Sequence, residues 1–363
     1  MTSPAGPMTS PAAPMTCPAV SFRHLQRLTD HIGLLERAEG IMPLHEHGYC
    51  VDDIARGLAM VCREPSPSEE LVTLARRYLY FLAQAQAPDG QFHNHLGHDR
   101  NWRDQPGTED CWGRALWGLG TAAARGPTEG IRVESLDQFN LSAQLSSQRP
   151  HAMAFAALGA AEILENWPGH SSALRLLDQA STVIGEPAGD PAWPWPAPRL
   201  SYANATIAEA VILAGWKLGR DPLLHAGLRM LDWLLLVETR SGHLSVVPAG
   251  GWGPGEPRPG FDQQPIEVAA LADACMRATA VTGDRTWLTG VDLCVAWFLG
   301  DNDARIPMLD ERTGGGSNSL GATSRNRNQG AAATLAMISV LQQGRLRRRD
   351  QGEEPGQRAR RPR

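Results

Sequence analysis

The chain has 363 residues, of which 42% are hydrophobic and 20% charged, a composition typical of a soluble globular protein. No apolar run reaches the roughly 18 residues that a membrane-spanning helix needs, so we expect no membrane span. The formal net charge is −5, yet residues 345–363 hold eight arginines against three acidic residues. The rest of the chain is therefore more acidic than the total indicates, which argues against a nucleic-acid groove.

Cysteine and lysine usage narrows the chemistry further. The six cysteines show neither C-x-x-C nor Cys/His spacing, so we expect free thiols in a reducing cytoplasm, no metal and no cofactor. Lysine occurs once, at Lys217, outside any G-x-x-x-x-G-K motif, which excludes P-loop chemistry.

Helical periodicity dominates the chain between two biased ends. Residues 1–21 repeat Pro, Ser and Ala and are expected to be a disordered tail, as are the Arg-rich residues 344–363. Between them the apolar spacing predicts twelve helices. Their expected ranges are 22–38, 51–63, 68–87, 109–125, 132–146, 150–166, 170–184, 203–219, 221–239, 264–282, 284–299 and 326–343.

Short and long connections alternate between these helices, which predicts six antiparallel helical hairpins in one domain, residues 22–343. Two long segments also resemble each other, since each has a Gly turn, an extended stretch and a Trp-bearing loop before a new helix. Such a supersecondary repeat favours a closed toroid over an open solenoid.

Five stretches carry a family resemblance: "HGYCVDDIARGL", "TEDCWGRALWGLG", "LSYANATIAEA", "FDQQPIEVAALADAC" and "NRNQGAAATLAM". The chain resembles an (α/α)6 barrel of the six-hairpin glycosidase type, an all-α fold. More narrowly it is similar to a bacterial family often associated with, or fused to, glycosyltransferases. The resemblance covers roughly residues 22–343 and implies carbohydrate chemistry, with a glycosyltransferase or other carbohydrate enzyme as a partner in the same pathway.

In the hairpin model the inner helices all begin at one rim of the barrel. Their starts read "GYCVDD", "GTEDCW", "QRPHAM", "SYANAT", "FDQQPIE" and "RNRNQG", and most are rich in polar or aromatic residues. Because binding residues concentrate on long loops set on a rigid scaffold, we expect the functional site at this rim.

Several carboxylates should converge there, as glycoside hydrolysis requires. The catalytic candidates are Asp53, Glu109, Asp110 and Glu267. We expect Glu109 or Asp110 to donate the proton and Asp53 or Glu267 to be its partner, with inversion of configuration. Of the neighbours Asp52 and Asp53, one should cap its helix and the other, Asp53, should reach the substrate.

Other side chains at the same helix starts suit the recognition of sugar hydroxyls and rings. The substrate-binding candidates are His47, Tyr49, Asp52, Trp112, Arg114, Tyr202, Asn204, Asp262, Gln263, Gln264, Arg325, Asn326 and Asn328. Trp193 and Trp195 also lie in a long loop where they could stack on pyranose rings, whereas Trp216, within a helix, is expected in the core.

We therefore expect a cytoplasmic glycoside hydrolase acting on an oligosaccharide or glycoconjugate. Three alternatives stay open. A sugar epimerase or isomerase would place histidines at the centre of the cavity, and a lyase would place a base beside a tyrosine, for instance His47 with Tyr49. A non-catalytic glycan-binding protein would scatter the carboxylates.

Overall fold

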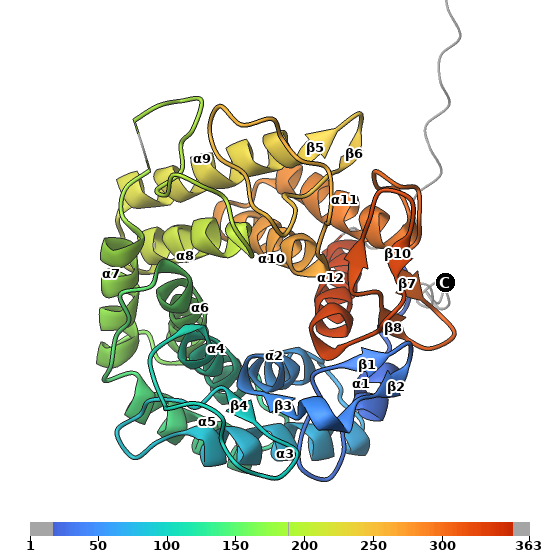
Figure 1. The fold of residues 1–363 in the computed structure, drawn as a ribbon. Helices are drawn as coiled ribbons and strands as arrows, with labels where there is room; N and C mark the ends of the chain where they lie inside the picture. Colours follow the sequence, from blue (N-terminus) through green and yellow to red (C-terminus); the bar gives the residue numbers. More distant parts are fainter. Residues whose placement is uncertain (1–16, 188, 351–363) are drawn as a thin grey trace, which may run out of the picture.

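The computed structural model describes residues 17–187 and 189–350, which fold into two concentric rings of helices (Figure 1). The inner ring consists of α2 (Val51–Cys62), α4 (Asp110–Arg125), α6 (Pro150–Asn166), α8 (Asn204–Lys217), α10 (Pro265–Thr282) and α12 (Ala331–Asp350). The outer ring consists of α1 (Arg23–Leu28), α3 (Glu69–Ala85), α5 (Glu129–Ser142), α7 (Ser171–Ile184), α9 (Asp221–Glu238) and α11 (Leu288–Leu299). This arrangement confirms the predicted (α/α)6 barrel. In the described part of the chain, no helix combines the length and hydrophobicity needed to cross a bilayer.

Residue pattern explains which helices lie inside. In α2 every residue but Asp52 is buried, because an inner helix packs on both ring neighbours and on an outer helix. In α3, by contrast, burial follows one stripe that includes Leu71, Leu74, Tyr78 and Leu82. An inner helix such as α2 is therefore buried on nearly all sides, whereas an outer helix such as α3 buries one stripe and exposes the rest.

Glycines allow the inner helices to approach closely. A Cβ on Gly159 of α6 would clash with the Leu116 carbonyl oxygen of α4, and one on Gly120 would clash with the Gly159 carbonyl. On the other side of α4, a Cβ on Gly118 would lie 2.5 Å from the carbonyl oxygen of Ala55 in α2. The motif "WGRALWGLG" thus supplies small residues for packing on both neighbours.

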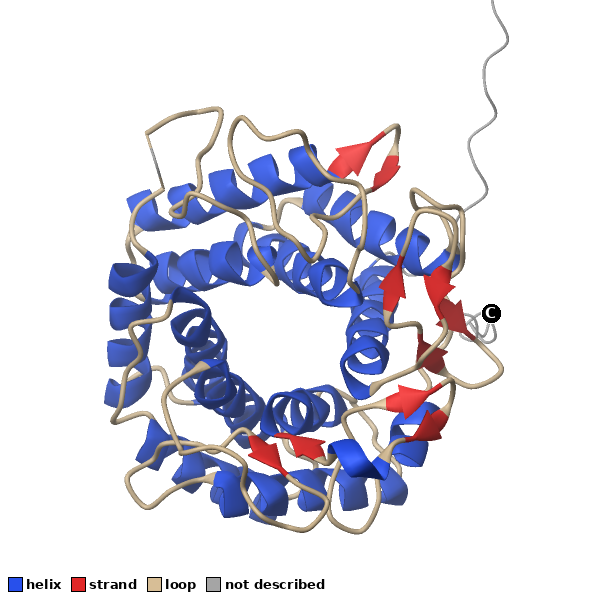
Figure 2. Ribbon diagram, viewed as in Figure 1, coloured by secondary structure: helices blue, strands red, loops and turns tan. Residues whose placement is uncertain are grey.

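The two ends of the barrel differ in their connections, as the sequence predicts. A short link joins each of α2, α4, α6, α8 and α10 to the outer helix that follows it, whereas long segments precede α2, α4, α8, α10 and α12. Within residues 17–187 and 189–350, all the strands lie in these long segments, as ten two-residue strands in five antiparallel pairs (Figure 2). They are β1 (Ala38–Glu39) with β2 (Met42–Pro43), β3 (Tyr49–Cys50) with β4 (His95–Leu96), β5 (Thr239–Arg240) with β6 (His243–Leu244), β7 (Leu309–Asp310) with β8 (Gly315–Gly316), and β9 (Ser319–Leu320) with β10 (Arg325–Asn326).

The first and last helices differ from their predicted ranges. The helix expected over 22–38 ends at Leu28, because the Asp30 carboxylate accepts hydrogen bonds from the N–H groups of Ile32 and Gly33 and forms a turn. At the other end α12 begins at Ala331 and continues to Asp350 rather than ending at 343. Arg345 explains the extension, since it forms a two-pronged ion pair with Glu64 at 2.8 and 2.9 Å. Residues 1–16 and 351–363 of the predicted tails lie outside the described residues.

Candidate functional site

The barrel mouth, the end of the ring where the inner helices begin, holds a cavity of about 550 Å³. This mouth cavity has the size typical of small-molecule sites, roughly 300–1,000 Å³. Its polar lining includes Glu36, His47, Asp53, Gln264, Asn318, Asn326 and Asn328. A larger hollow of about 1290 Å³ lies outside, between α7 and α9, but its charged side chains are all exposed. We place the site at the mouth because buried titratable groups converge there.

Asp53 is the buried acid of the mouth cavity. Its side chain is 6% exposed, and one carboxylate oxygen lies 3.3 Å from the guanidinium of Arg56, one turn further along α2. Burial raises the pKa of Asp53 to about 7, against the opposing effect of Arg56 and with help from the charges of Asp52 and Glu36. A carboxyl group with this pKa is protonated in about half of the molecules at pH 7.

Asp52, the neighbour of Asp53, faces α4 rather than its own helix. Its Oδ2 lies 3.4 Å from Nε of Arg114, and the Arg114 guanidinium stacks on the Phe155 ring at 4.0 Å. Neither aspartate caps α2, whose N-cap residue is Cys50 and has no side-chain capping bond. The prediction that one aspartate caps the helix is therefore wrong, because both carboxylates pair with arginines instead.

Asp110 begins α4 and accepts a hydrogen bond from the hydroxyl of Tyr202. The Tyr202 ring stacks on His151 at 4.2 Å, and His151 Nε2 lies 2.7 Å from the Tyr202 carbonyl oxygen. Burial lowers the pKa of His151, which favours the neutral imidazole. The adjacent Glu109 is exposed and pairs with Arg149 at the rim.

Glu267 holds the start of a neighbouring helix. Its carboxylate accepts hydrogen bonds from the backbone N–H groups of Ala203 and Asn204 and from Asn204 Nδ2 at 2.9 Å. Its side chain is buried, and burial raises its pKa to about 7 despite these bonds. Glu267 thus binds the otherwise unpaired N–H groups at the start of α8.

Other predicted site residues are buried and do not line the mouth cavity. Tyr49 is fully buried and donates its hydroxyl hydrogen bond to Asp30 at 2.7 Å. Trp112 is also fully buried, with its indole N–H on the Ser142 carbonyl oxygen. Gln263 is buried between Trp297 and Asp303. In this conformation none of the three can contact a substrate at the mouth, because neighbouring side chains cover them.

Asp262 and Arg325 have a different environment. Asp262 is exposed, and its backbone carbonyl accepts a hydrogen bond from the Ala249 N–H. Arg325 faces a separate surface hollow of about 780 Å³, where its guanidinium donates to the Pro307 carbonyl. Because successive strand residues point to opposite faces, Arg325 of β10 faces this hollow while Asn326 faces the mouth cavity.

The tryptophans of the long loops also belong to the core. Trp193 and Trp195 are 7% and 3% exposed and pack against Trp233 of α9. Trp216, expected in the core, is instead 38% exposed, and the Lys217 ammonium lies 3.9 Å from its ring centroid. Tyr202, which directly precedes α8 at the mouth, is 36% exposed.

Sequence reasoning missed three groups. Glu36 was missed because its segment was predicted to be helical. The segment instead contains bends and bridges, and Glu36 lines the mouth cavity. His151 lies in the predicted helix start "QRPHAM" but had no predicted role in the site. Glu209 lies deeper on α8, buried, with Oε2 unpaired among the described residues. Glu209 lies about one and a half turns after the start of α8, and this spacing could have indicated that it faces the inside of the ring.

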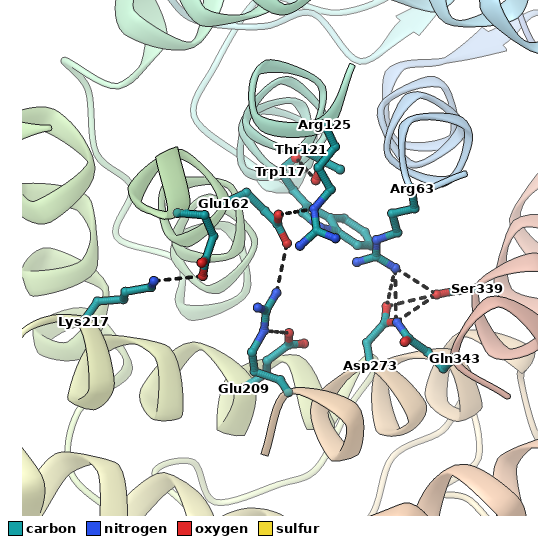
Figure 3. A network of polar contacts seen from close by, with 12 residues as sticks. Arg63, Trp117, Thr121, Arg125, Glu162, Glu209, Lys217, Asp273, Ser339 and Gln343 are labelled. Atoms are coloured by element: carbon teal, nitrogen blue, oxygen red, sulfur yellow. Dashed lines mark hydrogen bonds and ion pairs between the residues drawn. The ribbon is translucent and has the colours of Figure 1, made fainter. Parts of the chain in front are cut away.

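Beneath the mouth the ring is closed by charged side chains. A small cavity of about 30 Å³ lies below Arg56 and Arg114 and reaches Glu209 and Asp273. Figure 3 shows the floor network under it: Glu162 binds Arg125 at 2.7 Å and Arg277 at 2.9 Å, and Asp273 binds Arg63 at 3.1 Å and Ser339 at 3.0 Å. All six inner helices or their ends contribute to the polar contacts that close this end.

Histidines of the second long segment and of the segment before α2 do not form a metal site. His93 stacks on Trp102 at 4.8 Å, and His45 meets His98 edge-on at 5.8 Å. Across residues 17–187 and 189–350, no three His, Cys, Asp or Glu side chains gather as metal ligands would.

Comparison with known proteins gives a fold but no sequence family. No family model matches the chain, and no curated protein sequence matches it. Among solved structures it is similar to cellobiose 2-epimerase from Spirochaeta thermophila, with 13% identity, 91% and 94% of the two chains covered and a TM-score of 0.66. It is also similar to a sugar epimerase from a ruminal bacterium, with 12% identity, 88% and 95% coverage and a TM-score of 0.65.

A GH76 alpha-mannanase from Bacteroides thetaiotaomicron shares the fold as well, with 12% identity, 84% and 88% coverage and a TM-score of 0.57. Similarities at this level of identity define the chain as an (α/α)6 barrel.

Proposed function

We propose that this chain is a carbohydrate-active enzyme and that it hydrolyses a glycosidic bond at the barrel mouth. One observation carries the proposal: Asp53 is a buried carboxyl group that lines a ligand-sized cavity and has a pKa of about 7. A general acid works best when its pKa lies near the working pH. The similarity to sugar epimerases and to a mannanase supports the carbohydrate part of the proposal.

In the proposed reaction the protonated Asp53 gives its proton to the glycosidic oxygen, and the bond from that oxygen to the anomeric carbon breaks. Glu36, which lines the same cavity, removes a proton from a water that attacks the anomeric carbon from the opposite face. The products are two free sugars, with inverted configuration at the anomeric carbon. Glu109, exposed and outside this cavity, has no part in this scheme, and Asp110 serves to hold Tyr202.

The test is a panel of oligosaccharides incubated with the wild-type protein and with Asp53→Asn and Glu36→Gln. Asp221→Asn and Glu129→Gln are matched controls, since both residues are exposed in the first turn of outer helices. We expect wild type and controls to cleave one glycan, and Asp53→Asn to lose roughly 10²- to 10⁴-fold in kcat. Cleavage at an unchanged rate by Asp53→Asn would refute the proposed donor.

A second candidate, a sugar epimerase or isomerase, is favoured by His47 and His151, which both lie at the mouth. Histidines of suitable pKa transfer protons at a sugar carbon without breaking the glycosidic bond. The same panel separates the two functions: an epimer of the intact glycan, formed by the wild type and lost in His151→Asn, indicates an epimerase. Binding without any product indicates a glycan-binding protein.

A further inference from the structure

The turn before α8 has an unusual backbone. Ala203, the N-cap residue of α8, has φ 45° and ψ 41°, the left-handed conformation that residues with a Cβ rarely adopt. Such a conformation persists only where the surroundings hold it. Tyr202, which is 36% exposed at the mouth, directly precedes it.

Three inner helices hold this turn. From α10, Glu267 accepts hydrogen bonds from the backbone N–H groups of Ala203 and Asn204. From α6, the His151 ring lies 2.7 Å from the Tyr202 carbonyl oxygen, and from α4 Asp110 accepts the Tyr202 hydroxyl. Hydrogen bonds therefore fix both the backbone of the turn and the phenol group of Tyr202.

The Tyr202 ring has one covered face and one open side. His151 covers one face at a ring separation of 4.2 Å and an interplanar angle of 19°. Since 36% of Tyr202 remains exposed, the exposed part lies on the side away from His151. An aromatic face held rigidly at the barrel mouth loses little entropy when a flat, C–H-bearing sugar face packs on it.

We propose that Tyr202 is a stacking platform for a pyranose ring at the barrel mouth, and that Glu267 is the positioning residue that holds this platform through the left-handed turn. This inference rests on the proposed function, since it takes the ligand to be a carbohydrate. It gives Glu267 a role through the backbone rather than as the acid or base of the reaction.

The first test needs no ligand. The chain has four tyrosines, and the difference in ultraviolet titration between wild type and Tyr202→Phe reports the ionisation of Tyr202. Burial and the Asp110 carboxylate raise the pKa of Tyr202 in the native turn. Glu267→Gln turns an amide N–H towards the backbone N–H donors, so the turn should loosen and Tyr202 should titrate nearer its ordinary range. Glu64→Gln is the matched control and should leave the titration unchanged, since the Glu64 side chain is 11% exposed and pairs with Arg345, far from the turn.

The second test measures glycan affinity with the panel used above. We expect Tyr202→Ala to raise KM, or Kd for a bound glycan, at least tenfold, and Tyr202→Phe, which keeps the ring, to change it less than threefold. Glu267→Gln should raise KM while the pH profile of kcat keeps its shape. A glycan that binds but is not cleaved would refute the hydrolase and leave the platform intact. Unchanged affinity in Tyr202→Ala, an unchanged Tyr202 titration in Glu267→Gln, or no glycan binding by wild type would overturn the platform.

Discussion

Asp52 Oδ2 lies 3.4 Å from Arg114 Nε across the boundary between α2 and α4, while Asp53, one residue on, pairs with Arg56 of its own helix. Successive residues of a helix point about 100° apart, so two adjacent aspartates serve two different neighbours. The pair Asp52–Arg114 joins two inner helices, whereas the pair Asp53–Arg56 lies within α2, and its Asp53 lines the mouth cavity.

The Asp52–Arg114 pair should stabilise the fold more than an exposed pair at the same rim. Arg114→Leu leaves the Asp52 carboxylate, only 27% exposed, without its cation, so we expect a loss of about 1–3 kcal/mol in the free energy of unfolding. The control is Arg149→Leu, which removes the exposed partner of Glu109 and should cost under about 1 kcal/mol. Denaturant titration measures both; equal losses would contradict a structural role for the inner pair.

Hydrolysis should slow as the pH rises through about 7. The proposed donor must be protonated, and the pKa of Asp53 is about 7, so kcat should fall above that pH. The negative charge of Asp52 raises the pKa of Asp53, so Asp52→Asn should move this limb to lower pH. The measurement is kcat as a function of pH for the wild type and for Asp52→Asn. A shift of the limb to higher pH would exclude Asp53 as the titrating group.

The floor network should make stability depend on pH through Glu162. The charges of Arg277 and Arg125 lower the pKa of this buried carboxyl to about 2, against the opposing effect of burial, whereas an unfolded glutamate titrates near 4.3. The lowered pKa implies about 3 kcal/mol of stability that is present above about pH 5 and is lost as the pH falls through 2.

Glu162→Gln should therefore destabilise the protein by about 3 kcal/mol at pH 7, and the difference from wild type should shrink towards pH 2. The control is Glu165→Gln, three residues along α6. The Glu165 side chain is 39% exposed and pairs with Lys217, so its loss should cost under about 1 kcal/mol. Unfolding curves at pH 7 and at pH 3 test this; a difference that grows on acidification would mean that Glu162 is not charged in the native state.

The close approach of α4 and α6 should make Gly159 intolerant of a side chain. Gly159→Ala would push its methyl group into the Leu116 carbonyl, a backbone atom that cannot move away cheaply, so we expect a loss of roughly 1–3 kcal/mol or more. Gly130→Ala on α5 has nothing within 4 Å of the new methyl group and should be neutral or stabilising by up to about 1 kcal/mol. Thermal unfolding of the two variants compares them directly; a stable Gly159→Ala protein would contradict this packing.

Much of the fold could be predicted from the sequence, because helix formation depends on local patterns. The predicted helix over 150–166 coincides with α6, and Pro150 at its start supplies the signal. The helix predicted from 132 begins instead at Glu129, where Thr128 caps it through the Ile131 N–H. The helix predicted over 22–38 failed because the Asp30 turn competes locally with helix and has no periodicity of its own.

The location of the site could be predicted from the sequence, but the roles of most of its residues could not. The long segments before the inner helices located it at one rim, and Asp53, Gln264 and Asn326 do line the mouth cavity. The sequence could not tell that Tyr49 is bonded to Asp30 in the core or that Glu267 holds the start of α8.

By itself, then, the sequence determined the number and type of helices, the alternation of their connections and so the (α/α)6 barrel, since apolar period, caps and breakers act within a few residues. Only the tertiary structure decided which polar side chain faces the cavity and which is used up in a hydrogen bond or ion pair. Those outcomes depend on the rotation of each helix about its axis and on partners far away in the chain, such as Asp52 with Arg114 and Glu267 with Ala203. Burial, which gives Asp53 its raised pKa, is likewise a property of the closed ring and not of any one segment.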